Sequence, residues 1–98
     1  MSVPLKRKYN TRVYKEGLVT TVWLYDTPIV EFNAETRMAT LFTGGWETVT
    51  TRRRMNEALE ELCGTDRVSI YARKGRTVAR LNGIEHPFVG GLLTLNLF

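Results

Sequence analysis

The chain has little of the chemistry that most enzymes and metal sites use. Its 98 residues include one cysteine and one histidine. One cysteine excludes an internal disulfide and a multi-cysteine metal site, and one histidine excludes any site that needs two imidazoles. No apolar run approaches the roughly 18 residues of a membrane span. The basic N-terminus precedes no apolar segment, so we expect neither a secretory signal nor a membrane partner.

The composition is that of a small globular protein. Hydrophobic residues make up 43% of the chain and charged residues 24%. This length allows one domain, residues 1–98, with a thin core that a second copy would help to stabilise. Residues 1–10 are polar and basic, and we expect them to form a flexible arm.

Short strands are predicted on both sides of a single helix. Met55, Leu59, Leu62 and Cys63 form an apolar stripe that predicts a helix over about 50–63, ended by Gly64. The expected strands are 13–25 (with a turn at Glu16-Gly17), 29–32, 37–43, 67–73, 77–81, 84–86 and 92–98. The order indicates an α+β domain, a mostly antiparallel sheet of about 5–7 strands with the helix packed on one face.

The net charge of +4 is unevenly distributed along the sequence. Basic residues gather in an N-terminal arm, in a triplet and in a predicted hairpin; they include Lys6, Arg7, Lys8, Arg52, Arg53, Arg54, Arg73, Lys74 and Arg76. Such patches attract the phosphates of nucleotides or nucleic acids. The alternative is a solvated basic surface that keeps a small protein soluble.

The predicted helix has its charges in the unfavourable order. Arg52, Arg53 and Arg54 occupy the first turn, where the helix dipole favours acids, and Glu60 and Glu61 follow near the other end. A bound anion would remove this conflict at the helix start. The predicted ligand site therefore contains an aromatic ring, three threonines and the triplet: Trp46, Thr48, Thr50, Thr51, Arg52, Arg53 and Arg54.

Each of these residues also has an interpretation that needs no ligand. Trp46 can anchor the core and the threonines can cap the helix. The arginines can be solvated, or paired with Asp26, Glu31 or Glu35.

The segment from Gly44 to Asn56 reads Gly-Gly-Trp-x-Thr-x-Thr-Thr-x-x-Arg-Met-Asn. It resembles a segment found in a group of small tailed-bacteriophage proteins. The resemblance covers about the middle third of the chain and transfers no catalytic or binding residue. It implies a phage accessory protein in the cytoplasm of the infected bacterium, and this origin suggests a role against host defences.

No residue pattern predicts catalysis, a metal site or a cofactor. Walker A, dinucleotide-binding and nucleophile-elbow motifs are absent from the sequence. Cys63 lies on the apolar helix stripe, where a cysteine is usually inert. We therefore expect a non-enzymatic protein that binds a phosphate-bearing ligand, most simply a nucleotide-type signalling molecule that it sequesters. The alternatives are nucleic-acid binding, with Lys6, Arg7, Lys8, Arg73, Lys74 and Arg76 in contact, and docking on a host enzyme.

The last predicted strand is apolar to its end. Leu93, Leu95 and Leu97 share one strand face, and Phe98 follows. The strand can complete the core of its own chain, or it can be an edge strand that pairs with a second copy. We expect a homodimer or higher homo-oligomer with an interface at Leu93, Leu95, Leu97 and Phe98.

Overall fold

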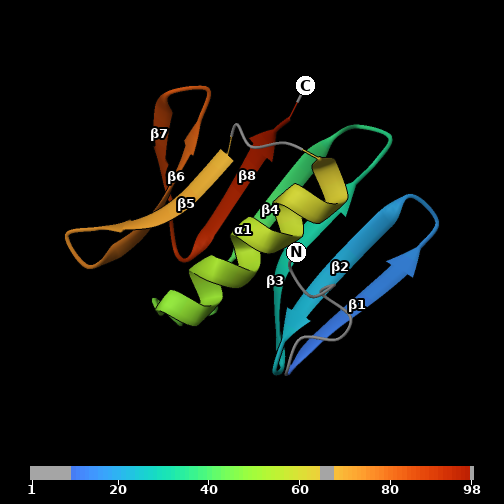
Figure 1. The fold of residues 1–98 in the computed structure, drawn as a ribbon, viewed down its shortest axis with the longest axis horizontal. Coiled ribbons are helices and arrows are strands. Elements are labelled where there is room, and N and C mark those ends of the chain that lie inside the picture. Colours follow the sequence, from blue (N-terminus) through green and yellow to red (C-terminus); the bar gives the residue numbers. More distant parts are fainter. Residues whose placement is uncertain (1–9, 65–67, 98) are drawn as a thin grey trace.

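The computed structural model, which describes residues 10–64 and 68–97, contains two antiparallel sheets and one helix (Figure 1). The larger sheet has the order β1-β2-β3-β4-β8. Its strands are β1 (Thr11–Glu16), β2 (Val19–Leu24), β3 (Thr27–Asn33), β4 (Met38–Phe42) and β8 (Leu92–Asn96). The smaller sheet has the order β5-β6-β7, with β5 (Val68–Arg73), β6 (Arg76–Leu81) and β7 (Ile84–Pro87).

The α+β class predicted from the sequence is confirmed, with more strands and one more sheet than expected. The described residues form eight strands: the expected turn at Glu16-Gly17 separates β1 from β2, and the strand expected at 84–86 pairs with β6 as Ile84–Pro87. Lys74-Gly75 and Asn82-Gly83 have positive φ at both residues, which is the backbone that two-residue hairpins require. The strands joined by these hairpins pair only with one another, and so they form a sheet of their own.

The larger sheet buries one face, because its apolar residues alternate with polar ones. Val22, Val30, Leu41 and Leu95 point into the core beneath the helix. The opposite face carries Trp23, whose ring lies 5.7 Å from the Arg12 guanidinium carbon. The core is therefore a single layer between this sheet and the elements that cover it.

The helix α1 (Val49–Cys63) crosses the buried face of the larger sheet (Figure 1). Its buried side chains are Thr51, Met55, Ala58 and Leu59, at the spacing of one helix face. Thr48 is the N-cap, and Gly64 ends the helix in the left-handed conformation with φ 62°. The predicted boundaries of about 50–63 were correct to within one residue. No helix in the described ranges is long and apolar enough to cross a membrane.

The apolar C-terminal strand completes the core of its own chain. Leu95 and Leu97 are 2% and 1% exposed, and Leu93 is half-buried against the same core. This corrects the prediction that these leucine side chains form an oligomer interface, since buried side chains offer no such surface. Phe98 and residues 1–9, including the predicted basic arm, lie outside the described residues. β8 does lie at the edge of the sheet, as the prediction required.

Candidate ligand pocket at the start of the helix

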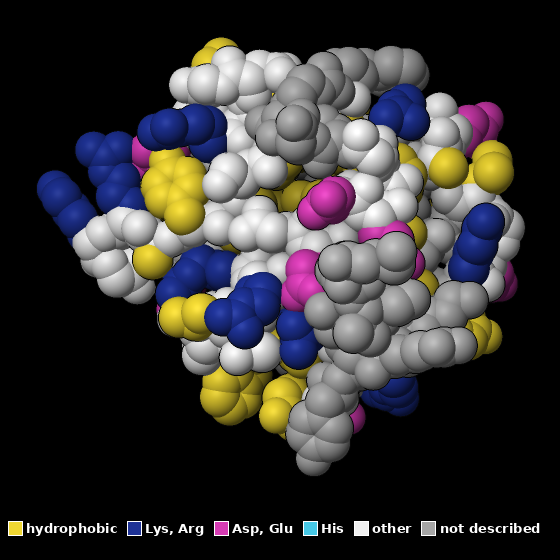
Figure 2. Space-filling view, viewed as in Figure 1, with side chains coloured by type: hydrophobic (Ala, Val, Ile, Leu, Met, Phe, Trp, Pro, Cys, Tyr) yellow, Lys and Arg dark blue, Asp and Glu magenta, His cyan; other side chains and the backbone are white. Residues whose placement is uncertain are grey.

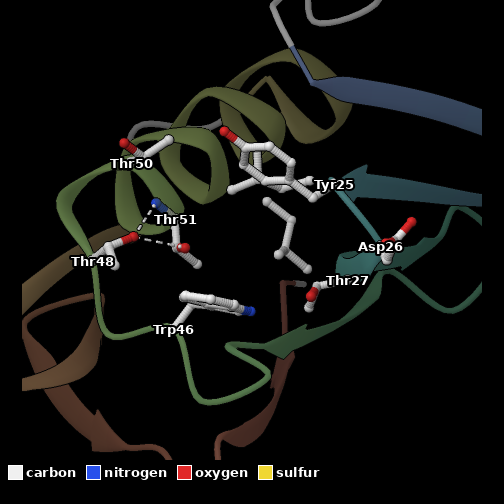
Figure 3. Close-up of a pocket in the computed structure, with 9 residues that line it drawn as sticks. Tyr25, Asp26, Thr27, Trp46, Thr48, Thr50 and Thr51 are labelled. Atoms are coloured by element: carbon white, nitrogen blue, oxygen red, sulfur yellow. Dashed lines mark hydrogen bonds between the residues drawn. The ribbon is translucent and has the colours of Figure 1, made fainter.

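A pocket of about 550 Å³ opens between the β2–β3 turn and the first turn of α1 (Figure 3). Two elements that are distant in the sequence thus form its walls. The lining residues are Leu24, Tyr25, Asp26, Thr27, Ile29, Trp46, Thr48, Thr50 and Thr51. Four of the seven residues predicted to bind a ligand, Trp46 and the three threonines, are therefore brought together around one cavity.

Tyr25 and Trp46 lie on opposite sides of this pocket (Figure 3), and the apolar residues Leu24 and Ile29 also line it. Tyr25 is 62% exposed and Trp46 is 60% exposed. Trp46 is therefore not the core anchor that one interpretation of the sequence proposed. Large exposed aromatic rings beside an apolar hollow are typical of sites for planar ligands.

The loop before the helix holds Trp46 in place. A side chain at Gly44 would put its Cβ 2.7 Å from the Thr27 Cγ2 atom, so the loop can approach β3 only with glycine there. The Trp46 amide donates to the Thr43 carbonyl at 2.9 Å, and the Gly45 amide donates to the Thr43 hydroxyl at 3.3 Å. Gly44 and Gly45 thus position the indole, and their conformation is explained without a ligand.

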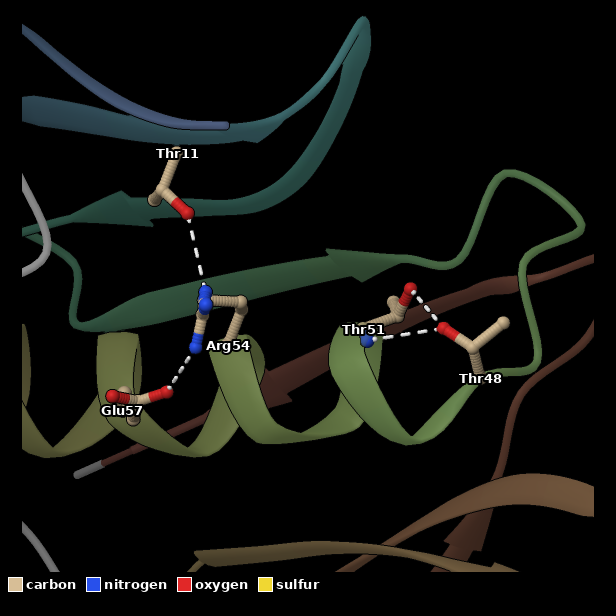
Figure 4. A network of polar contacts seen from close by, with 5 residues as sticks. All are labelled: Thr11, Thr48, Thr51, Arg54 and Glu57. Atoms are coloured by element: carbon tan, nitrogen blue, oxygen red, sulfur yellow. Dashed lines mark hydrogen bonds and ion pairs between the residues drawn. The ribbon is translucent and has the colours of Figure 1, made fainter. Parts of the chain in front are cut away.

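The first turn of α1 presents polar groups at the pocket. The Thr48 hydroxyl accepts a hydrogen bond from the Thr51 amide at 3.2 Å and lies 3.0 Å from the Thr51 hydroxyl (Figure 4). In the part of the chain that is described, the amides of Val49 and Thr50 have no protein acceptor. Such amides at the positive end of a helix dipole are suited to an anionic group.

The arginine triplet does not converge on the pocket. Arg52 donates to the Thr77 hydroxyl at 3.3 Å. Arg54 donates to Thr11 at 3.2 Å and pairs with Glu57 at 2.9 Å (Figure 4). Arg53 is exposed on the helix surface. Two of the three arginines therefore hold neighbouring elements in place, and the pairs with Asp26, Glu31 or Glu35 considered above do not form.

Arg73, Lys74 and Arg76 lie together at the end of the β5–β6 hairpin. Lys6, Arg7 and Lys8, the other predicted nucleic-acid contacts, lie outside the described residues. The hairpin is attached to the helix start, because the Thr77 amide donates to Glu47 at 2.9 Å while its hydroxyl accepts from Arg52. The basic triplet and the basic hairpin are thus neighbours, which the sequence left open.

Three side chains outside the pocket have shifted pKa values. The hydrogen bond from Arg73 lowers the pKa of the Glu85 carboxyl, and the same bond raises the pKa of Arg73. The two groups lie 2.6 Å apart. Burial raises the pKa of the Cys63 thiol, and the charge of Arg37 opposes this shift. A raised pKa favours the protonated thiol over the nucleophilic thiolate.

Five lining residues were missed by the sequence reasoning. Tyr25 was assigned to a strand, but its φ of 54° places it in the β2–β3 turn. Leu24, Asp26, Thr27 and Ile29 join the site only because β2 and β3 pass beneath the helix start. The sole local signal was the Asp26-Thr27-Pro28 turn, and a turn by itself does not indicate which distant segment it faces.

Comparison with known proteins identifies the family. Residues 4–94 match the family described as Kyanoviridae Gp96 protein. The chain belongs to this family. The match includes every element described above except the last two residues of β8, and it supports the phage origin that the Gly44–Asn56 segment implied. No curated protein and no solved structure is significantly similar to the chain.

Proposed function

We propose that this phage protein is a non-enzymatic binding protein that sequesters a nucleotide-type ligand. The base would lie between Tyr25 and Trp46, and a phosphate would meet the amides of Val49 and Thr50. The observation that carries the proposal is that two exposed aromatic residues lie on opposite sides of a partly apolar pocket, directly beside a helix start. Stacking on such rings contributes about 1–3 kcal/mol per base.

Binding without turnover is supported by the pocket lining. The described residues around it include one carboxylate, Asp26, and no histidine, cysteine or lysine. General acid–base and nucleophilic catalysis usually need a positioned pair of such groups. As a member of a phage family, the protein would act in the cytoplasm of the infected bacterium, where sequestering a signalling nucleotide would counter a host defence.

The first experiment identifies the ligand. The protein is purified from its bacterial host and denatured, and the released small molecules are analysed by mass spectrometry. We expect a nucleotide in a fixed ratio to protein for the wild type and much less for Trp46→Leu.

The second experiment measures binding through Trp46. In a Trp23→Phe background, Trp46 is the one remaining tryptophan, and its fluorescence reports the pocket directly. Ligand quenching is expected, and Tyr25→Leu should weaken binding roughly tenfold or more, from the loss of one stacked face. To test whether charge near the pocket attracts the ligand, Arg53→Gln is better than replacing all three arginines. Arg52 and Arg54 also hold Thr77 and Thr11 in place, so their loss would disturb the fold. The proposal is wrong if no nucleotide is released and none quenches Trp46.

A further inference from the structure

One face of the molecule collects basic side chains from two elements (Figure 2). We call it the basic face and define it by Arg52 and Arg53 of α1 with Arg73, Lys74, Arg76 and Arg80 of the β5–β6 hairpin. Figure 2 shows Lys and Arg side chains gathered over the helix start and over this hairpin in the same view. The basic face therefore begins beside the pocket.

Hydrogen bonds connect the basic face to the loop that forms one wall of the pocket. Glu47, which accepts from the Thr77 amide at 2.9 Å, directly follows Trp46 in the chain. Arg52 binds the same Thr77 from the helix side. A ligand held by Trp46 thus lies one residue away from the contact that anchors the hairpin.

Most of this charge is not neutralised within the described structure. Arg73 pairs with Glu85, and the Arg80 guanidinium lies over the Tyr71 ring at 5.5 Å. Arg53, Lys74 and Arg76 have no ion pair among the described residues. An anionic partner would therefore find three available cations.

The hairpin tip concentrates like charges at a cost to its own stability. Arg73 and Arg76 are directly opposite in the β5–β6 register, and Lys74 is in the two-residue turn between them. Like charges opposite one another destabilise a strand pair. Nothing in the packing of the turn requires three cations, and a chain of phosphates would offset the repulsion.

We infer that the same site also binds single-stranded nucleic acid, an inference that rests on the base site between Tyr25 and Trp46 in the proposed function. One unpaired base enters the pocket between Tyr25 and Trp46, and the phosphates that follow cross Arg53 toward Lys74 and Arg76. Exposed aromatic rings beside a basic track are the usual means of binding single strands. A duplex keeps its bases stacked and paired, so it cannot fill the pocket. A mononucleotide fills the pocket but leaves the hairpin unused.

The test compares ligands of increasing length by fluorescence and by isothermal titration calorimetry. The probes are the four deoxynucleoside monophosphates, a mixed-sequence octanucleotide containing all four bases, and the same octanucleotide as a duplex. We expect the single strand to bind at least about tenfold more tightly than any monophosphate, and more tightly than the duplex. Its affinity should fall with salt by about 0.7 logarithmic units for each phosphate contact and tenfold rise in salt.

Two double variants that each remove two positive charges test whether the location of the cations, and not only the net charge, determines octanucleotide binding. Lys74→Gln/Arg76→Gln should bind the octanucleotide no more tightly than the monophosphates, whose binding persists. The slope of log affinity against log salt concentration should become about 1.4 smaller in magnitude. Lys15→Gln/Arg37→Gln removes two charges on β1 and the β3–β4 turn, and should bind the octanucleotide like wild type. Circular dichroism confirms that both variants are folded.

The outcomes distinguish this inference from the proposed function. If the monophosphates bind as tightly as the octanucleotide, the inference of single-stranded nucleic-acid binding is wrong and the assignment of the pocket to a nucleotide stands. If neither binds, the proposed function fails as well. Equal binding of the duplex, or equal losses in the two double variants, would overturn the inferred path along the hairpin.

Discussion

Asn56 shows how one side chain can end a sheet. Its amide nitrogen donates to the Ile70 carbonyl at 2.9 Å, and its oxygen accepts from the Ile70 amide at 2.8 Å. These two bonds reproduce the pairing that a neighbouring strand would make with β5. The side chain therefore protects the edge of the small sheet and fastens it to the helix. Asn56 belongs to the phage-like segment, and this contact gives it a structural role.

Replacing Asn56 should test this contact directly. Asn56→Ala leaves the backbone groups of Ile70 without partners, and we expect a loss of about 1–3 kcal/mol in the free energy of unfolding. Glu60→Ala, an exposed change on the same helix, should cost less than about 0.5 kcal/mol. Urea denaturation measures both. Equal effects would show that the Asn56 bonds contribute little.

The Arg73–Glu85 pair makes stability depend on pH. The folded pKa of Glu85 is lowered, so its contribution is complete above the unfolded pKa of about 4.3 and is lost as pH falls through the folded pKa. We expect the wild type to lose more stability than Glu85→Gln when denaturation is compared at about pH 6 and about pH 3. Parallel losses in the two proteins would assign the pH dependence to other carboxyls.

At the scale of elements, the start of α1 serves both the fold and the pocket. Thr48 caps the helix through Thr51, and Thr51 is buried while lining the cavity. Because α1 begins at Val49, only Arg52 of the arginine triplet lies in the first turn, and Arg53 and Arg54 follow in the second, which corrects the prediction that all three occupy the first turn. The first turn has no acid and the last turn no base, so neither end favours the helix dipole. The cap and the side-chain bonds of Arg52 and Arg54 offset part of this cost.

The helix cap can be removed without touching the aromatic rings. Thr48→Ala should lower the free energy of unfolding by about 1 kcal/mol, because the Thr51 amide loses its acceptor. Thr48→Ser keeps a hydroxyl and should retain most of the stability. Thermal unfolding followed by circular dichroism compares them. A serine variant as unstable as the alanine variant would mean that the methyl group, not the hydroxyl, is what matters.

Element positions were largely predictable from the sequence, whereas their partners were not. The apolar spacing from Met55 to Cys63 and the stop at Gly64 located the helix, because both signals are local. The turns at Lys74-Gly75 and Asn82-Gly83 located the hairpins for the same reason. The hydrogen bond of Arg54 with Thr11, and the pocket that Tyr25 shares with the helix start, join segments that are distant in the sequence. No local pattern encodes such contacts.

At the scale of the whole molecule, the edge of β8 is where a second copy would bind. The Leu97 amide donates to Arg37 and the Thr43 amide to Gly91. The alternation of an antiparallel pair then directs the Thr94 amide away from β4. The homodimer predicted from the sequence remains a prediction. We now expect its interface to be formed by the backbone of β8 and not by the leucine side chains.

Oligomeric state can be tested by removing that one amide. We expect light scattering after size exclusion to give a dimer for the wild type and a monomer for Thr94→Pro, since proline is tolerated at a free edge. Lys15→Pro makes the matching change on β1, the other edge of the sheet, and should leave the dimer intact. A wild type that stays monomeric at every concentration would show that the dimer prediction is wrong.

The pairing of β4 with β8 also has a consequence for how the chain folds. The meander from β1 to β4 is built from short hairpins, whereas β8 must return across residues 43–91 to reach its neighbour. Closing a long loop costs more entropy than closing a hairpin, so local contacts generally form first. We therefore expect the rate-limiting step to leave β8 undocked. Mutations in β8 would then accelerate unfolding and leave the folding rate unchanged, while mutations in the meander would slow folding.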